Sequence, residues 1–99
     1  MFDNKRIVTC GISDKIPAEI QLGLWIMIDN IRNNGGELDY IQVFRLSAEG
    51  TEQRIIHTQE QPAYRNEIIL PFLAPTVGDA KIFVIDNGGY STMMLAGEY

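Results

Sequence analysis

The stretch IPAEIQLGLWIMIDNIRNN, residues 16–34, decides the fold, because it predicts the one long helix of the chain. Pro17 suits the first helical position, where its missing N–H costs nothing, and Glu19 favours the positive end of the helix dipole. The glycine pair at 35–36 can supply the left-handed cap that ends a helix. We therefore expect a helix from 17 to about 34.

This helix has an apolar face and a second, smaller apolar patch. At 100° per residue the larger face collects Ile16, Ile20, Gly23, Leu24, Met27, Ile28 and Ile31, and we expect it to pack on a sheet. Leu22, Trp25 and Ile26 fall on roughly the opposite side, where a helix lying on a sheet meets water. Covering three such side chains is worth about 6 kcal/mol, which favours an interface. The alternatives are scattered exposure and cover by the connection at 73–79.

Segments rich in β-branched and aromatic residues surround the helix and predict strands. They are residues 6–12, 40–47, 53–61, 67–72, 81–85 and 91–95. The 81–85 segment is apolar on both faces and is expected to be central in the sheet. Pro71 demotes the 67–72 segment to an edge strand or a bulge.

The turns between these segments predict antiparallel pairing. Gly50 lies in a loop at 48–51, and Asn87-Gly88 is a strong hairpin signal. A pairing of Ser47 with Glu52 sets Val43 opposite Ile56, on the side expected to face the core, and Gln42 opposite His57 on the other side. We expect one α+β domain over residues 1–99: a mainly antiparallel sheet of five or six strands, order β-α-β-β-β-β-β, with one long helix on one face.

Composition indicates a single soluble domain. The chain has 99 residues, of which 45% are hydrophobic, which is enough for one packed core. Eight Lys and Arg against thirteen Asp and Glu give a net charge of -5, and the scattered basic residues disfavour nucleic acid and anionic membranes as partners. The longest uncharged apolar run, 22–28, is far too short for a membrane span, and the start lacks the apolar run of a signal peptide.

A few residues are candidates for chemistry. His57, the only histidine, shares a strand face with Gln59, and with Glu60 or Cys10 as a second group it could serve a small enzyme or a ligand-binding protein. The simpler interpretation is a partly exposed sheet histidine, with Cys10 a buried strand cysteine. Cys10 is the only cysteine, which fits a reducing compartment. No phosphate-binding fingerprint or metal-ligand spacing is present in the sequence, so we expect no cofactor and no metal.

Several segments, in their order and spacing along the whole chain, resemble a known family. They are IPAEIQ (16–21), LDYIQVF (38–44), IHTQEQP (56–62), IFVID (82–86) and STMMLA (91–96). The sequence resembles a small family of Gram-positive bacteria and their phages that is classed as a domain of unknown function. This resemblance implies a bacterial origin without a mechanism.

The function that these observations favour is a noncatalytic cytoplasmic protein that associates with itself or with another protein. Leu22, Trp25 and Ile26 are the predicted contact, with Trp25 as its anchor, because tryptophan is enriched at interface hot spots. A small enzyme or ligand-binding protein using His57 is the alternative.

Overall fold

The computed structural model describes residues 1–71 and 76–99, and its centre is a six-stranded sheet in the order β1-β6-β5-β2-β3-β4. The strands are β1 (Lys5–Val8), β2 (Ile41–Glu49), β3 (Glu52–Gln59), β4 (Tyr64–Leu70), β5 (Asp79–Asp86) and β6 (Tyr90–Leu95). β1 runs parallel to β6, and all other neighbours are antiparallel. The predicted α+β class with a mainly antiparallel sheet is confirmed.

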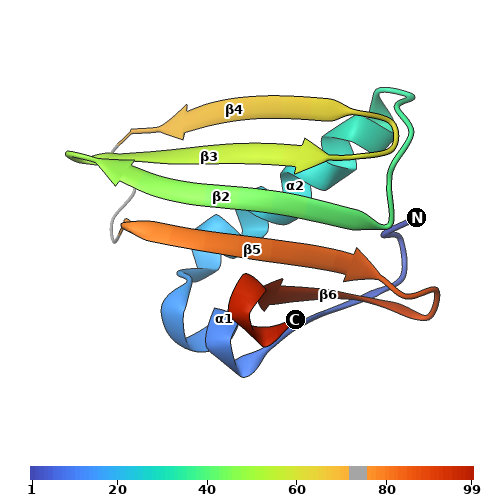
Figure 1. The fold of residues 1–99 in the computed structure, drawn as a ribbon, viewed down its shortest axis with the longest axis horizontal. Helices are drawn as coiled ribbons and strands as arrows, with labels where there is room; N and C mark the ends of the chain where they lie inside the picture. Colours follow the sequence, from blue (N-terminus) through green and yellow to red (C-terminus); the bar gives the residue numbers. More distant parts are fainter. Residues whose placement is uncertain (72–75) are drawn as a thin grey trace.

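The long helix α2 (Ala18–Asn33) crosses behind the sheet (Figure 1). Pro17 directly precedes it, and Gly35 takes a φ of 79° just after it, so the predicted bounds are confirmed to within a residue. Ile20, Leu24 and Ile28 are fully buried, which confirms the predicted core face. No helix in the described ranges is long and apolar enough to cross a membrane.

A short helix, α1 (Cys10–Lys15), replaces the second half of the strand predicted at 6–12. Thr9 caps it by accepting a hydrogen bond from the Ile12 amide, and the Glu98 carboxylate accepts bonds from the Thr9 hydroxyl and the Gly11 amide. Ile12 is fully buried on this helix. The prediction was wrong here because capping and the burial of one isoleucine outweigh the β propensity of the segment.

The β2–β3 hairpin is tighter than predicted. Glu49 pairs with Glu52 around Gly50 and Thr51, which places Phe44 opposite His57 instead of opposite Ile55. The predicted loop at 48–51 was too long, because both strands continue to the turn that the positive φ of Gly50 allows. A shift of two residues keeps each side chain on its own face.

The face assigned to the core was wrong. Side chains that point toward α2 are Phe44, Leu46, Ile55, Ile82, Val84 and Met93, all fully buried. Val43 and Ile56, which we expected to be core, point to the opposite face together with Phe83 and Ile85, and all four are half-buried. Both faces of β2 and β3 carry apolar side chains, so alternation alone does not say which face the helix covers.

The remaining strands form near their predicted positions, but β4 begins at Tyr64, three residues before the predicted start at 67. β5 lies between β6 and β2, so it is central, and β4 is the edge strand beyond β3. Pro71 directly follows β4, as its missing N–H favours, and Phe72 of the predicted strand lies outside the described residues.

Candidate functional site

His57 lies on the inner face of β3 and is fully buried, so the predicted partly exposed position is wrong. Its ring stacks on the Phe44 ring, with the two centroids 4.2 Å apart. The Tyr64 ring contacts it edge-to-face, with centroids 5.5 Å apart. The rings sit together because β2 and β3 pair Phe44 with His57. The histidine is therefore part of the packed core.

Amide side chains fix the proton of this ring. The Gln42 Nε2 group donates to the Asp39 carbonyl and to Gln59 Oε1, so Gln42 Oε1 faces His57 Nε2 at 2.6 Å. An amide oxygen only accepts, so His57 Nε2 carries the proton. Burial lowers the pKa of His57 to about 4, which keeps the ring neutral at pH 7. The predicted grouping of His57 with Gln42 and Gln59 is thus present, as a structural network.

The other residues of the predicted enzyme lie apart from this ring. Glu60 is exposed in the turn after β3, and Cys10 is exposed at the start of α1, which corrects the prediction of a buried strand cysteine. β1, which leads to Cys10, stands four strand spacings from β3, or roughly 19 Å. A hollow of about 410 Å³ near the β3–β4 turn is lined by Gln59 and Tyr64, and His57 is not part of its wall.

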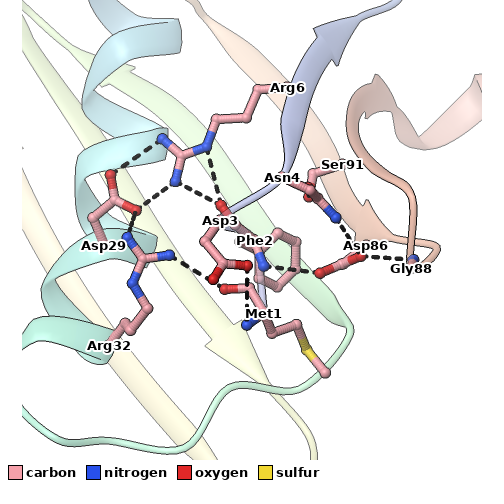
Figure 2. A network of polar contacts seen from close by, with 10 residues as sticks. All are labelled: Met1, Phe2, Asp3, Asn4, Arg6, Asp29, Arg32, Asp86, Gly88 and Ser91. Atoms are coloured by element: carbon pink, nitrogen blue, oxygen red, sulfur yellow. Dashed lines mark hydrogen bonds and ion pairs between the residues drawn. The ribbon is translucent and has the colours of Figure 1, made fainter.

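A second polar network ties the N-terminal segment to the sheet (Figure 2). Asp86 accepts hydrogen bonds from the Phe2 and Gly88 amides and from Asn4. Burial acts to raise the pKa of Asp86, but these hydrogen bonds outweigh it and hold the pKa below its usual value. Phe2 itself is fully buried in the core. The carboxylate is occupied in fixing the chain, and within the described residues no three His, Cys, Asp or Glu side chains group as a metal site.

The predicted helix patch is only partly exposed. Leu22 is 61% exposed and Ile26 is 47% exposed, but Trp25 is only 9% exposed. The Arg6 guanidinium lies 4.8 Å from the centroid of the Trp25 ring and is held there by the Asp29 carboxylate. The sequence predicted that Trp25 is exposed to solvent. A helical wheel considers the helix alone and does not show that edge strand β1 places Arg6 over the Trp25 ring. Of the 73–79 connection, the alternative cover, residues 73–75 lie outside the described residues, and Val77 is hydrogen-bonded to Gln53 of β3.

The face of the sheet opposite α2, which we call the outer face, carries many apolar side chains. Its apolar members are Ile7, Ile41, Val43, Ile56, Ile69, Phe83, Ile85 and Met94, each half-buried or exposed. They adjoin one another across strands, since Val43 pairs with Phe83 and Ile41 with Ile85. In the described part of the chain no α-helix covers this face, but the short 3-10 helix η1 (Ala96–Glu98) contacts β5, and the Tyr99 ring lies edge-on to the Phe83 ring at 5.5 Å.

A shallow hollow marks one end of the outer face. It measures about 370 Å³ and is lined by Ile41, Val43, Thr58 and Lys81, with acidic Asp39 and Glu60 also at its wall. Sequence reasoning missed this surface because it assigned Val43 to the core. Lys81 was the available signal: it shares a face of β5 with Phe83, and lysine side chains are rarely buried, so this face is expected to be exposed to solvent.

Comparisons with known proteins agree with this fold. A family model described as "Staphylococcal protein of unknown function (DUF960)" matches residues 5–98. The crystal structure of a protein of unknown function from Enterococcus faecalis is 26% identical and superposes with a TM-score of 0.83, over 98% of this chain and 92% of that chain. None of the curated proteins matches. The expected resemblance to a Gram-positive family of unknown function is confirmed, and the chain belongs to the DUF960 family.

Proposed function

We propose that this protein is a noncatalytic interaction domain that binds another protein through the outer face of its sheet. The observation that carries this proposal is a group of apolar side chains on β5 and β2, where Val43 pairs with Phe83 and Ile41 with Ile85, with Ile56 of β3 diagonal to Val43. Neither of the two described α-helices packs over this group. In a two-layer domain the uncovered face of an antiparallel sheet is normally polar. Partly exposed apolar side chains gathered on one face in this way are typical of binding sites.

The outer face is also well suited to binding because it is rigid. β5, β2 and β3 are each paired on both sides, so the backbone beneath the surface is fixed before a partner arrives. A preformed surface loses little conformational entropy on binding. The hollow beside Val43 and Thr58 has room for an apolar side chain of the partner.

The helix patch is a second candidate surface. Leu22 and Ile26 are exposed large apolar side chains on one helix face. Trp25, the anchor expected from sequence, is engaged by Arg6, so the patch offers two side chains where three were predicted. It supports a smaller contact than the outer face does.

The enzyme alternative has weaker support. The His57 ring is enclosed and neutral, and neither Glu60 nor Cys10 has a hydrogen bond to it. A general base must reach the proton that it removes. As part of the same proposal we place the protein in the cytoplasm, since its one cysteine is an exposed free thiol of the kind kept reduced there.

Capture with matched variants tests the proposed surface. The parent protein, an outer-face variant (Val43→Gln with Ile56→Gln) and a helix variant (Leu22→Gln with Ile26→Gln) are used as bait in lysate of the native cells, with mass spectrometry as the readout. Each pair replaces two apolar side chains by polar, uncharged ones, so the net charge of the protein is unchanged. Far-UV circular dichroism and denaturation midpoints check that all three baits are folded.

We expect a protein that the parent and the helix variant capture and the outer-face variant loses at least about tenfold. If the outer-face variant captures the same proteins as the parent, the proposed surface is wrong. A protein lost only with the helix variant would transfer the function to Leu22 and Ile26.

A further inference from the structure

The outer face is basic in its middle and acidic at the strand ends, where Glu49, Glu52 and Asp79 also point outward. Its middle holds a basic band, which we define as Arg45, Arg54, Arg65 and Lys81 together with Glu67. The band sums to +3 (four cations, one anion), whereas the remaining four basic and twelve acidic residues sum to -8, giving the net -5. Register creates this asymmetry, since the cations come from four different strands.

Two cations of the band stand directly opposite each other. Arg45 of β2 pairs with Lys81 of β5, and like charges at directly opposite positions destabilise a sheet. Arg54 and Arg65 each pair with the Glu67 carboxylate, but Arg45 and Lys81 have no carboxylate within ion-pair distance among the described residues. This repulsion lies in the middle of the proposed binding surface. It would be relieved by an anionic group of a bound partner.

Apolar side chains lie directly beside these two charges. Arg45 lies opposite Ile56 on its other side, and the Lys81 ammonium is 5.5 Å from the centroid of the Phe83 ring. A matching surface must therefore present carboxylates among apolar side chains. We propose that the outer face binds an acidic and apolar segment of a different protein, an inference that rests on the proposed function.

A second copy of the chain fits this surface poorly. A two-fold contact between outer faces brings the same patch of both subunits together, so the basic band meets itself. Arg45 and Lys81 of one subunit would then face Arg45 and Lys81 of the other across a desolvated contact, with no carboxylate to neutralise them. Charge complementarity favours a foreign partner.

Nucleic acid also fits less well than protein. Single-strand binders use rows of exposed aromatic rings along a basic groove. Phe83 is the one aromatic ring in the described outward positions of β2, β3 and β5, and Tyr99 already packs edge-on against it at 5.5 Å. Acidic side chains flank the band, with Asp39 and Glu60 at one end and Glu49 at the other, and they would repel a phosphate chain that runs across the face.

A random peptide library displayed on phage, selected against the folded full-length protein, tests the chemistry of the partner. Fluorescence anisotropy then measures the affinity of the selected peptides for the parent, for Lys81→Glu, for Lys15→Glu and for the neutral variant Val43→Gln with Ile56→Gln. Lys15→Glu is the matched control, because Lys15 is exposed on α1 and its replacement changes the net charge equally. A mixed-sequence single-stranded oligonucleotide is measured beside the peptides.

We expect selected peptides rich in Asp and Glu among apolar residues, with binding that weakens as salt rises. Lys81→Glu should weaken binding at least about tenfold and Lys15→Glu by less than about twofold. The neutral outer-face variant should also lose binding, because it removes the apolar contacts.

The remaining outcomes separate the two proposals. In one outcome the selected peptides depend on Val43 and Ile56 and yet show no enrichment in acidic residues, or bind Lys81→Glu as well as the parent. Either result contradicts the proposal of an acidic partner but keeps the outer face as the binding surface. Peptides insensitive to every outer-face substitution, or no selected peptide at all, count against both proposals. An oligonucleotide that binds more tightly than the peptides and is lost with Lys81→Glu assigns the band to nucleic acid. A dimeric parent that the neutral outer-face variant makes monomeric assigns the face to a second copy.

Discussion

At the scale of single residues, His57 makes the stability of the fold depend on pH. Its pKa is about 4 in the folded protein, lowered by burial from 6.5. Between these two values the unfolded chain binds a proton that the native chain does not, so stability falls as the pH falls through this window. We expect the histidine to contribute a loss of about 2 kcal/mol between pH 7.5 and pH 5.

Urea denaturation of the parent and of His57→Gln at both pH values measures this loss. Glutamine can still donate to Gln42 Oε1 but does not titrate, so the variant should lose less stability on acidification, by that amount. Equal losses in the two proteins would show that the ring is not neutral and buried. Because His57 is absent from the outer face, the variant should bind partners like the parent.

Trp25 and Leu22 provide a second comparison at this scale. Trp25 is packed beneath Arg6, whereas Leu22 is largely exposed on the same helix. Trp25→Ala should cost about 3–5 kcal/mol of unfolding free energy, and Leu22→Ala less than about 0.5 kcal/mol. A Trp25→Ala protein as stable as the Leu22→Ala protein would restore Trp25 to the surface, where the sequence had placed it.

At the scale of elements, helix α2 packs on the sheet through the apolar face that the sequence predicted. Leu24 and Ile28 are fully buried against the inner side chains of the sheet. Leu24→Ala or Ile28→Ala should each cost about 2–5 kcal/mol in denaturant melts. Either variant within 0.5 kcal/mol of the parent, a limit set by typical surface substitutions, would contradict the assigned packing.

The β2–β5 pairing predicts a substitution that raises the stability of the fold. Lys81→Glu replaces a like-charge pair with Arg45 by an opposite-charge pair, so it should stabilise the fold by about 0.2–1 kcal/mol even though it removes binding. Lys15→Glu should give no such gain. A destabilised Lys81→Glu protein would mean that the two cations do not repel in the native sheet.

The helix could be predicted because its period, its preceding proline and its glycine cap all agree. Helix α1 could not, since Ile7, Val8, Thr9 and Ile12 read as one β-branched run and only the contact of Glu98 with Thr9 and Gly11 shows where the strand stops. That contact joins residues at opposite ends of the chain. Local propensity does not contain it.

At the scale of the whole molecule, one choice, namely which face of the sheet α2 covers, decides which side chains remain for the proposed binding surface. Val43 and Phe44 are both apolar, and which of them faces α2 depends on where the helix lies. The basic band depends on the same choice and on the strand order, because neither the net charge of -5 nor the spacing of the cations shows that Arg45 lies opposite Lys81. The fold class and the core face of the helix could be predicted from the sequence, but the surface that we propose for binding could not.

The central claim is that partners bind the outer face. Isoleucine methyl groups report on it directly by NMR, because Ile41, Ile56 and Ile85 lie on the outer face, Ile55 lies in the core and Ile26 lies on the helix patch. In a titration with the captured partner protein we predict that the methyl signals of Ile41, Ile56 and Ile85 shift most and that Ile26 stays unchanged. A spectrum in which Ile26 shifts and the outer-face isoleucines do not would contradict the account.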